Sequence, residues 1–134
     1  MFIGEYTEKL DRRYRLILPK RYRELLKEGE HEPGSMFFVA GQAMTVYTDK
    51  GFGKLVFGLY DKLKSNTANA EERRLAHLAG IHAQVFLRRD GCVEIPRTFR
   101  EIYRPDKGEE MSIVGCGDYF EIWNKESWDR KEEC

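Results

Sequence analysis

The sequence predicts a β-rich α+β protein, built from two copies of one small unit that share a core and are joined by a helical connector. The first observation is a repeat, because residues 10–25 align without a gap with residues 87–102. The alignment places Pro19 on Pro96 and conserves apolar size, whereas the neighbouring charges vary. The second observation is the length of 134 residues, which would leave each copy marginal alone. The two halves are therefore expected to bury one shared core.

The first unit, residues 5–50, is expected to contain four strands and one short helix. The β-prone run at 16–18 predicts a strand, and Pro19 ends it because proline lacks a hydrogen-bond donor. Proline also suits the first turn of a helix. The predicted elements are strands at 2–9, 14–18, 36–40 and 44–48, a helix at 21–27 and a loop at 28–35.

A helical connector is expected at residues 51–80. Its first helix is predicted by apolar residues at the spacing of one helical face, namely Phe52, Leu55, Val56, Leu59 and Leu63. Asn69 is a good cap for a second helix, and Glu72 is placed to return a hydrogen bond to the Asn69 amide. One face of this second helix is expected to carry Leu75, Leu78, Ala79 and His82.

The second unit, residues 81–127, is expected to repeat the first. The predicted elements are strands at 85–87, 93–95, 111–115 and 120–124, a helix at 96–103 and a polar loop at 104–110. Residues 129–134 are charged and are expected to fray.

The formal net charge of the chain is zero, but the charges are distributed unevenly. Between Lys9 and Lys27, eight cations against two anions give a net charge of +6. Such a basic stretch can steer a polyanion even when the whole molecule is neutral. The three cysteines are odd in number and widely spaced, which argues against a disulfide framework or a zinc site. With no signal peptide and no membrane-length apolar stretch, we expect a cytosolic protein without membrane contact.

Enzyme chemistry is not favoured by this sequence, and neither a cofactor nor a metal is expected. The histidines are scattered, and the serines lack a nucleophile elbow. The run at 115–117, Gly-Cys-Gly, resembles a thiol site, but the repeat places it in a hairpin turn. Aromatic residues at 120, 123 and 128 are expected to pack in the core or between subunits rather than stack on unpaired bases.

The order of elements resembles the MraZ family of bacterial regulators. The resemblance rests on a strand, an Asp-x-x-Gly-Arg turn, a strand, a proline, a short helix and two strands, all duplicated around a helical connector. It runs from the Met-Phe-x-Gly start to Trp128 and includes Phe-Glu-Ile-Trp at 120–123. This family is related to the AbrB-like (SpoVT-AbrB) swapped-hairpin transcription factors. The resemblance thus implies two pseudo-symmetric AbrB-like repeats.

The signature turn departs from the family pattern in both copies. In the first copy Asp11 and Arg15 match the pattern, but Tyr14 stands in place of glycine. In the second copy the glycine is kept, while Arg88 and Cys92 replace Asp and Arg. Glycine at this position eases a turn with positive φ. Tyr14 therefore predicts either a different turn or about 1 kcal/mol or more of backbone strain.

The resemblance implies a sequence-specific regulator that binds short tandem repeats upstream of the division and cell-wall gene cluster. It also implies ring-shaped homo-oligomers, double-stranded DNA as the partner, and a cytoplasmic, nucleoid-associated location. Arginine carries a planar fork of donors that suits phosphate and the guanine edge, and Asp11 is expected to anchor the turn. The candidate DNA-binding residues are Asp11, Arg12, Arg13, Arg15, Lys20, Arg21, Arg88 and Arg89.

Two alternatives remain open at the level of sequence. The charged turns are also compatible with solvated, salt-bridged turns, and Lys20 and Arg21 with plain exposed helix cations. Glu94 would repel phosphate near the second turn, which is expected to make partial contact at most. The altered positions Tyr14 and Cys92 favour a second hypothesis, an oligomeric scaffold or protein-interaction module that has lost DNA readout.

Overall fold

The computed structural model describes residues 1–28 and 32–133. Residues 29–31, within the loop predicted at 28–35, and Cys134 lie outside the described residues. The described chain forms an α+β fold, as predicted, with these elements: β1 (Glu5–Lys9), β2 (Arg15–Ile17), α1 (Lys20–Lys27), β3 (Ser35–Val39), β4 (Met44–Thr48), α2 (Asp49–Lys64), α3 (Ala70–Ala79), β5 (His82–Phe86), β6 (Cys92–Glu94), α4 (Arg97–Tyr103), β7 (Glu110–Gly115), β8 (Tyr119–Asn124) and α5 (Lys125–Glu133).

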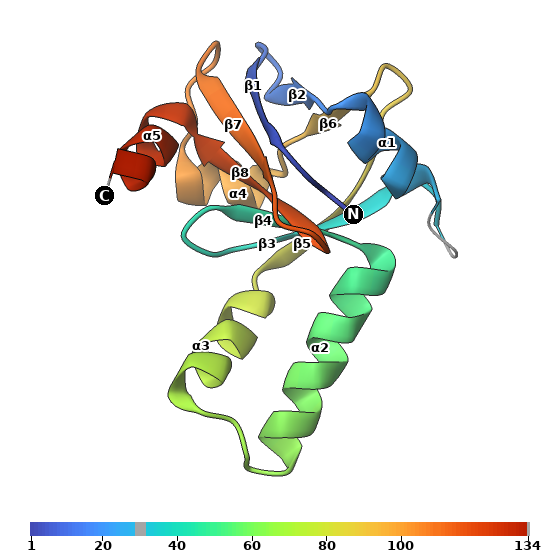
Figure 1. The fold of residues 1–134 in the computed structure, drawn as a ribbon, viewed down its shortest axis with the longest axis vertical. Helices are drawn as coiled ribbons and strands as arrows, with labels where there is room; N and C mark the ends of the chain where they lie inside the picture. The colour runs from blue at the N-terminus through green and yellow to red at the C-terminus, as the bar shows by residue number, and fades with distance from the viewer. Residues whose placement is uncertain (29–31, 134) are drawn as a thin grey trace.

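The strands form one six-stranded antiparallel sheet and one separate two-stranded ribbon. The sheet has the order β1-β7-β8-β4-β3-β5, and the ribbon pairs β2 with β6. Strand β1 therefore pairs with β7 from the distant half of the chain, and β5 pairs with β3. The helical hairpin of α2 and α3 extends away from this β-rich body (Figure 1). Each half of the chain thus completes the sheet of the other.

The strand registers of the two halves are equivalent. In the ribbon, Leu16 lies opposite Val93, the residue with which it aligns in the sequence repeat. In the sheet, Tyr6 lies opposite Ile113, and Ala83 lies opposite Phe38. These two pairs occupy the same positions of the two halves. A local pseudo-two-fold axis therefore passes through the Leu16–Val93 pair.

The main core lies between the sheet, the ribbon and the short helices α1 and α4. It is built largely from the apolar positions that recur in the repeat, which confirms that part of the sequence prediction. Its fully buried side chains, each with 0% exposure, include Leu16, Leu18, Tyr22, Phe38, Val46, Val93, Ile95, Phe99, Ile113 and Phe120. Because both halves supply these side chains, the shared core positions the turns at either end of the ribbon.

The connector contains two helices, as predicted, but the second helix ends before His82. The predicted cap at Asn69 is confirmed, because its Oδ1 accepts a hydrogen bond from the Glu72 amide at 2.8 Å. In return, Oε1 of Glu72 accepts from the Asn69 amide at 3.2 Å. The prediction that His82 lies on a helix was wrong. Helix α3 ends at Ala79, before Gly80, and His82 begins β5, where its ring packs against Phe52 at 4.9 Å.

The end of the described chain also differs from the prediction. Residues 129–133 were expected to fray, but they belong to helix α5. Oδ1 of Asn124 accepts a hydrogen bond from the Ser127 amide at 3.0 Å and so caps the helix start. The ring of Trp128 packs 5.4 Å from that of Trp123 on the sheet. Capping and aromatic packing explain why this charged segment is helical.

Candidate nucleic-acid interface

Two charged turns continue the β2–β6 ribbon at its opposite ends. The first turn comprises residues 11–15, the second comprises residues 88–92, and the antiparallel pairing puts Arg15 opposite Glu94 and Ile17 opposite Cys92. Since each strand has three residues, the ribbon spans about 10 Å. Both turns lie at the end of the molecule that is distant from α2 and α3 (Figure 1). They form one candidate surface.

Asp11 anchors the first turn through the backbone, as the sequence predicts. Its Oδ1 accepts hydrogen bonds from the amides of Arg13 at 2.7 Å and Arg15 at 2.9 Å. The amide of Asp11 donates to the carbonyl of Arg15 at 3.0 Å. Arg12 and Arg13 are exposed, and neither forms an ion pair within residues 1–28 and 32–133. The turn therefore holds two uncompensated guanidinium groups towards solvent.

Arg15 is placed differently from its two neighbours. Its side chain is only 16% exposed, and its Nε donates to Oε1 of Glu94 at 3.2 Å. This ion pair crosses the ribbon between directly opposed residues. The carboxylate of Glu94 thus offsets the charge of Arg15 on the outer face of the ribbon. The sequence alone did not predict this ion pair.

The second turn has its own carboxylate anchor, shifted along the chain. Arg88 occupies the position of Asp11, but Oδ1 of Asp90 accepts from the Cys92 amide at 3.0 Å. This backbone hydrogen bond is the main reason why the pKa of Asp90 is lowered from its usual value. Arg88 Nε lies 3.9 Å from Oδ1 of Asp90, and Arg89 is exposed. The second turn therefore also presents arginines from an anchored backbone.

Tyr14 adopts the left-handed conformation that favours glycine. Its φ is +60°, and that of the equivalent Gly91 is +84°. Of the two alternatives that the sequence left open, the structure shows the strained backbone. The ring of Tyr14 lies under two cations: the guanidinium carbon of Arg100 is 4.9 Å and Nζ of Lys107 is 5.5 Å from the ring centroid.

Arg23 and Arg100, which align in the repeat, lie against the turns of the opposite halves. A Cβ atom at Gly91 would lie 2.6 Å from Nη1 of Arg23, so Arg23 fills the space that a side chain at Gly91 would need. The Nε atoms of both arginines are buried without a hydrogen-bond partner in the described part of the chain. Sequence reasoning did not select these residues for the site, although the recurring Arg-Glu pair at 23–24 and 100–101 was a signal.

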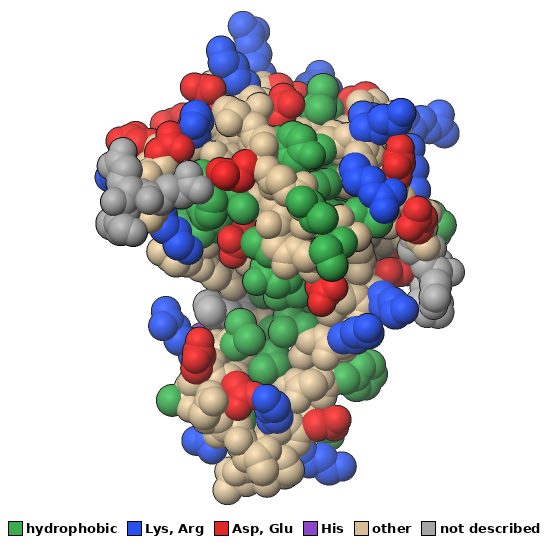
Figure 2. All heavy atoms as spheres, in the orientation of Figure 1, with side chains coloured by type: hydrophobic (Ala, Val, Ile, Leu, Met, Phe, Trp, Pro, Cys, Tyr) green, Lys and Arg blue, Asp and Glu red, His purple; other side chains and the backbone are tan. Residues whose placement is uncertain are grey.

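The remaining candidates lie at the start of α1. Lys20 is exposed, and Arg21 forms an exposed ion pair with Glu24 at 3.6 Å, a kind of pair that contributes little. The amide of Leu18 bonds to the carbonyl of Gly91 at 3.1 Å, which brings the start of α1 near the second turn. Lys and Arg side chains gather over this end of the molecule, where Figure 1 shows the turns and α1 (Figure 2).

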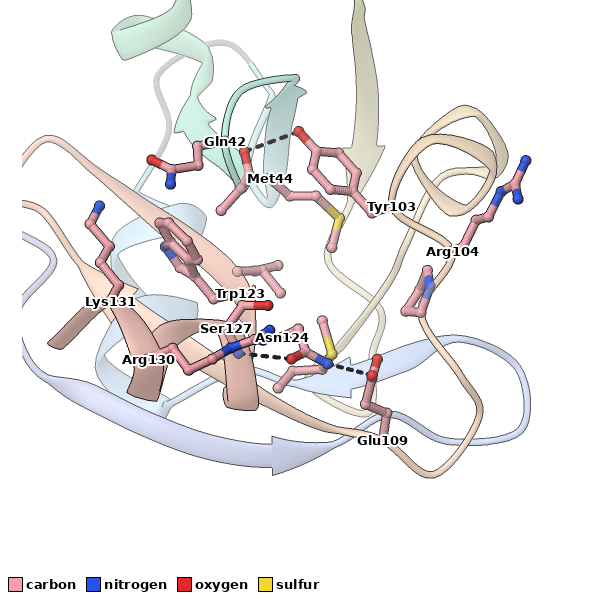
Figure 3. A pocket seen from close by; sticks show the side chains of 14 residues that line it. Gln42, Met44, Tyr103, Arg104, Glu109, Trp123, Asn124, Ser127, Arg130 and Lys131 are labelled. Atoms are coloured by element: carbon pink, nitrogen blue, oxygen red, sulfur yellow. Dashed lines mark hydrogen bonds between the residues drawn. The ribbon is translucent and has the colours of Figure 1, made fainter. Parts of the chain in front are cut away.

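A pocket of about 790 Å³ lies elsewhere, between the sheet and helices α4 and α5 (Figure 3). Three of its polar side chains are bonded within the protein. The Tyr103 hydroxyl accepts from the Gly41 amide at 2.8 Å, and Asn124 donates to Glu109. Lys131 lies 4.6 Å from the Trp123 ring. These contacts fasten the loop before β7 and helix α5 to the sheet.

The run at 115–117 belongs to the β7–β8 hairpin: Gly115 ends β7, and Cys116 and Gly117 lie in the predicted turn. Desolvation by burial is the main cause that raises the pKa of the Cys116 thiol, to about 11. Such a thiol is almost fully protonated near neutral pH and is a poor nucleophile. Within the described ranges, no helix combines the length and apolar character needed to cross a membrane.

Comparisons with known proteins agree with the resemblance seen in the sequence. No family model matches the chain. The transcriptional regulator MraZ of Micrococcus luteus is 30% identical over 132 residues, which cover 96% of this chain and 84% of that protein. The protein of the same name from Lactiplantibacillus plantarum is 31% identical over 144 residues, with coverage of 98% and 88%. That of Dictyoglomus thermophilum is 31% identical over 137 residues, with coverage of 99% and 87%. The chain therefore belongs to the MraZ family of transcriptional regulators.

Proposed function

We propose that this chain is a sequence-specific regulator that binds double-stranded DNA at short tandem promoter repeats, those of the division and cell-wall gene cluster. The observation that carries the proposal is the pair of carboxylate-anchored turns at the two ends of the β2–β6 ribbon. Together these turns present four exposed arginines, Arg12, Arg13, Arg88 and Arg89. Guanidinium groups donate to both phosphate oxygens and guanine edges. One surface can therefore both position the protein on the duplex and read its base sequence.

The ribbon itself has suitable dimensions for a groove. The major groove of B-DNA admits a two-stranded β-ribbon. Leu16 and Val93 are buried beneath the ribbon, so the alternate residues of both strands face outward. Among these outward residues, Arg15 is paired with Glu94. We therefore assign direct contact to the exposed arginines of the turns, and a supporting role on the ribbon to Arg15. Lys20 and Arg21 would contribute phosphate contacts from α1.

We further propose that residues 5–50 and 81–127 are pseudo-symmetric AbrB-like swapped-hairpin units around a connector at 51–80. The equivalent registers of the β1–β7 and β5–β3 pairs support this assignment. A ring-shaped homo-oligomer would offset the zero net charge by presenting several turns to consecutive repeats. Exposed apolar side chains on α2, with Phe57 at 71% and Tyr60 at 57% exposure, support self-association. The protein would then act in the cytoplasm at the nucleoid.

A gel-shift titration with the DNA upstream of the gene tests the proposed function. We expect specific binding that weakens steeply as salt increases, because phosphate contacts release counterions. The double variant Arg12→Ala, Arg13→Ala should bind more weakly and show a shallower salt dependence. Arg74→Ala, which removes one cation from α3 in the connector, is the control for non-specific loss of positive charge and should bind as wild type. Absence of any shift with wild type at low salt would refute the proposal.

A second candidate function is favoured by the ion pair between Arg15 and Glu94. If that pair has replaced a DNA contact, the chain is an oligomeric scaffold or interaction module whose turns no longer read bases. The same titration separates the two candidates. A scaffold would oligomerise normally but would show no preference for its own upstream DNA over a random duplex.

A further inference from the structure

We propose that Tyr14 is a positioning residue that holds Arg100 and Lys107 beside the first turn as contacts to a DNA backbone phosphate. This inference rests on the proposed DNA-binding function and names a part of that surface outside the turn itself. The backbone of Tyr14 is strained, because its φ is +60° although the side chain is large. A cost of about 1 kcal/mol or more persists only where the surroundings support the conformation.

The surroundings of the Tyr14 ring are cationic and come from two separate elements. Arg100 lies on α4, and its guanidinium carbon is 4.9 Å from the ring centroid. Lys107 lies in the loop before β7, with Nζ at 5.5 Å. This loop is fastened to the strand end before the first turn, because the Gly108 amide donates to the Leu10 carbonyl at 2.7 Å. The ring therefore joins the turn, α4 and the loop.

An aromatic partner has a consequence that a carboxylate partner does not have. Glu94 holds Arg15, and Glu101 holds Arg97 at 3.1 Å, so in both pairs an anion offsets the positive charge. The face of an aromatic ring attracts a cation but leaves its full charge in place. Neither Arg100 nor Lys107 has an ion pair within the described residues. Two ordered and uncompensated cations thus flank the first turn.

The surface around these cations is recessed rather than flat. One recess of about 560 Å³ is lined by Asp11 and Arg12 of the first turn together with Lys107. A second recess, of about 260 Å³, is lined by Tyr14, Arg97, Arg100 and Glu101. A phosphate bound in the first recess would lie beside both Arg12 and Lys107. The contact would therefore continue the arginine surface of the turn along the DNA backbone.

The second turn lacks an aromatic ring with two cations beside it. The Leu10 amide donates to the carbonyl of Glu109 at 2.9 Å, and the Leu87 amide donates to the carbonyl of Gly34 at 2.8 Å, so Glu109 and Gly34 are equivalent. Lys107 stands two residues before Glu109, and Glu32 stands two residues before Gly34. These two equivalent positions therefore have opposite charges. Gly91 also offers no ring to hold a cation. We therefore expect the first turn to make most of the phosphate contacts of each chain.

Fluorescence anisotropy with a random-sequence duplex, repeated over a series of salt concentrations, tests the inference. Phosphate contacts do not depend on base sequence. Each contact that is lost therefore makes the negative slope of log K against log salt shallower by about 0.9. We expect Lys107→Gln to make the slope shallower by about that amount. Lys54→Gln makes the same charge change on the connector helix α2 and should leave the slope unchanged.

Tyr14→Phe keeps the ring and should bind as wild type, whereas Tyr14→Leu removes it. Tyr14→Leu should weaken binding about fivefold, because a cation–π contact is worth about 1 kcal/mol. It should also make the slope shallower, because the two cations are no longer held in place. A purely structural role for Tyr14 would instead reduce thermal stability and leave the slope unchanged. An unchanged slope in folded Tyr14→Leu, or in Lys107→Gln, would overturn the inference. A wild-type protein that fails to bind any duplex at low salt would refute the proposed function itself.

Discussion

Leu16 lies directly opposite Val93 in the β2–β6 ribbon, and each stands at the position that the other holds in its own copy of the repeat. Both side chains are fully buried. The pair marks a pseudo-two-fold axis around which β1 joins β7 and β5 joins β3. Neither half therefore has a complete sheet without the other, and both are expected to unfold together.

The substitution Leu16→Ala tests this coupling. Removing a fully buried leucine side chain should cost about 2–5 kcal/mol of unfolding free energy. Both tryptophans, Trp123 and Trp128, lie in the second half of the chain, so their fluorescence reports on the half that does not contain the substitution. We expect urea unfolding followed by tryptophan fluorescence and by circular dichroism to give one coincident, destabilised transition.

The neighbouring substitution Ile17→Ala is the control, because Ile17 is 51% exposed on the same strand. It should change the unfolding free energy by no more than about 0.5 kcal/mol. A tryptophan transition that stays at the wild-type midpoint in Leu16→Ala would show that the two halves unfold independently.

Much of the fold was predictable because apolar spacing and proline position are local signals. Pro19 and Pro96 each precede a short helix, and the buried residues Tyr22 and Phe99 follow from the same alignment. The interleaving of the halves was not predictable in this way. Strand β1 is largely exposed, and the periodicity of its residues does not specify that its partner is β7, more than 100 residues away.

The same distinction applies to the candidate site. The Asp11 anchor was predicted because an aspartate bonds to amides within its own turn. The Arg15–Glu94 ion pair depends on the register of two distant strands, and the contact of Tyr14 with Arg100 depends on the packing of α4. Sequence alone contains no local signal for either contact.

The substitution Glu94→Gln should release Arg15 for contact with DNA. Glu94 accepts from Arg15 Nε and offsets its charge, and its own side chain is partly exposed. Removing the carboxylate charge should raise affinity for duplex DNA and make the salt dependence steeper by about 0.9, equivalent to one phosphate contact. Glu126→Gln, the same change on α5, should have no such effect. Unchanged affinity and salt dependence in folded Glu94→Gln would remove this pair from the interface.

Acid should weaken the connector through Glu72. Its hydrogen bond from Lys62, followed by that from the Asn69 amide, lowers the pKa of Glu72 below its usual value. A lowered pKa means that the folded state favours the carboxylate, so this stabilisation is present above the unfolded pKa. It is lost as the pH falls through the lowered pKa of the folded state. Glu72→Gln should therefore be less stable than wild type at pH 7.

We expect the difference in unfolding free energy between wild type and Glu72→Gln to shrink as the pH falls below about 4, the usual range of glutamate. Urea unfolding at a series of pH values measures this difference. Glu71→Gln, the adjacent exposed carboxylate on α3, provides the control. A difference that stays constant across the series would contradict the role of the charged Glu72 in the cap.

Cys116 should be chemically inert and dispensable for DNA binding. Burial, followed by the nearby carboxylate of Glu121, raises the pKa of its thiol to about 11. At pH 8 about one molecule in a thousand would carry the thiolate, the form that reacts. Iodoacetamide should therefore alkylate Cys116 far more slowly in the folded protein than in urea, as measured by peptide mass spectrometry. Cys116→Ser should bind duplex DNA with wild-type affinity, because the thiol donates to the Val114 carbonyl at 3.6 Å within the β7–β8 hairpin, away from the charged turns. Rapid alkylation in the native state, together with loss of DNA binding in a folded Cys116→Ser protein, would instead assign this thiol a functional role.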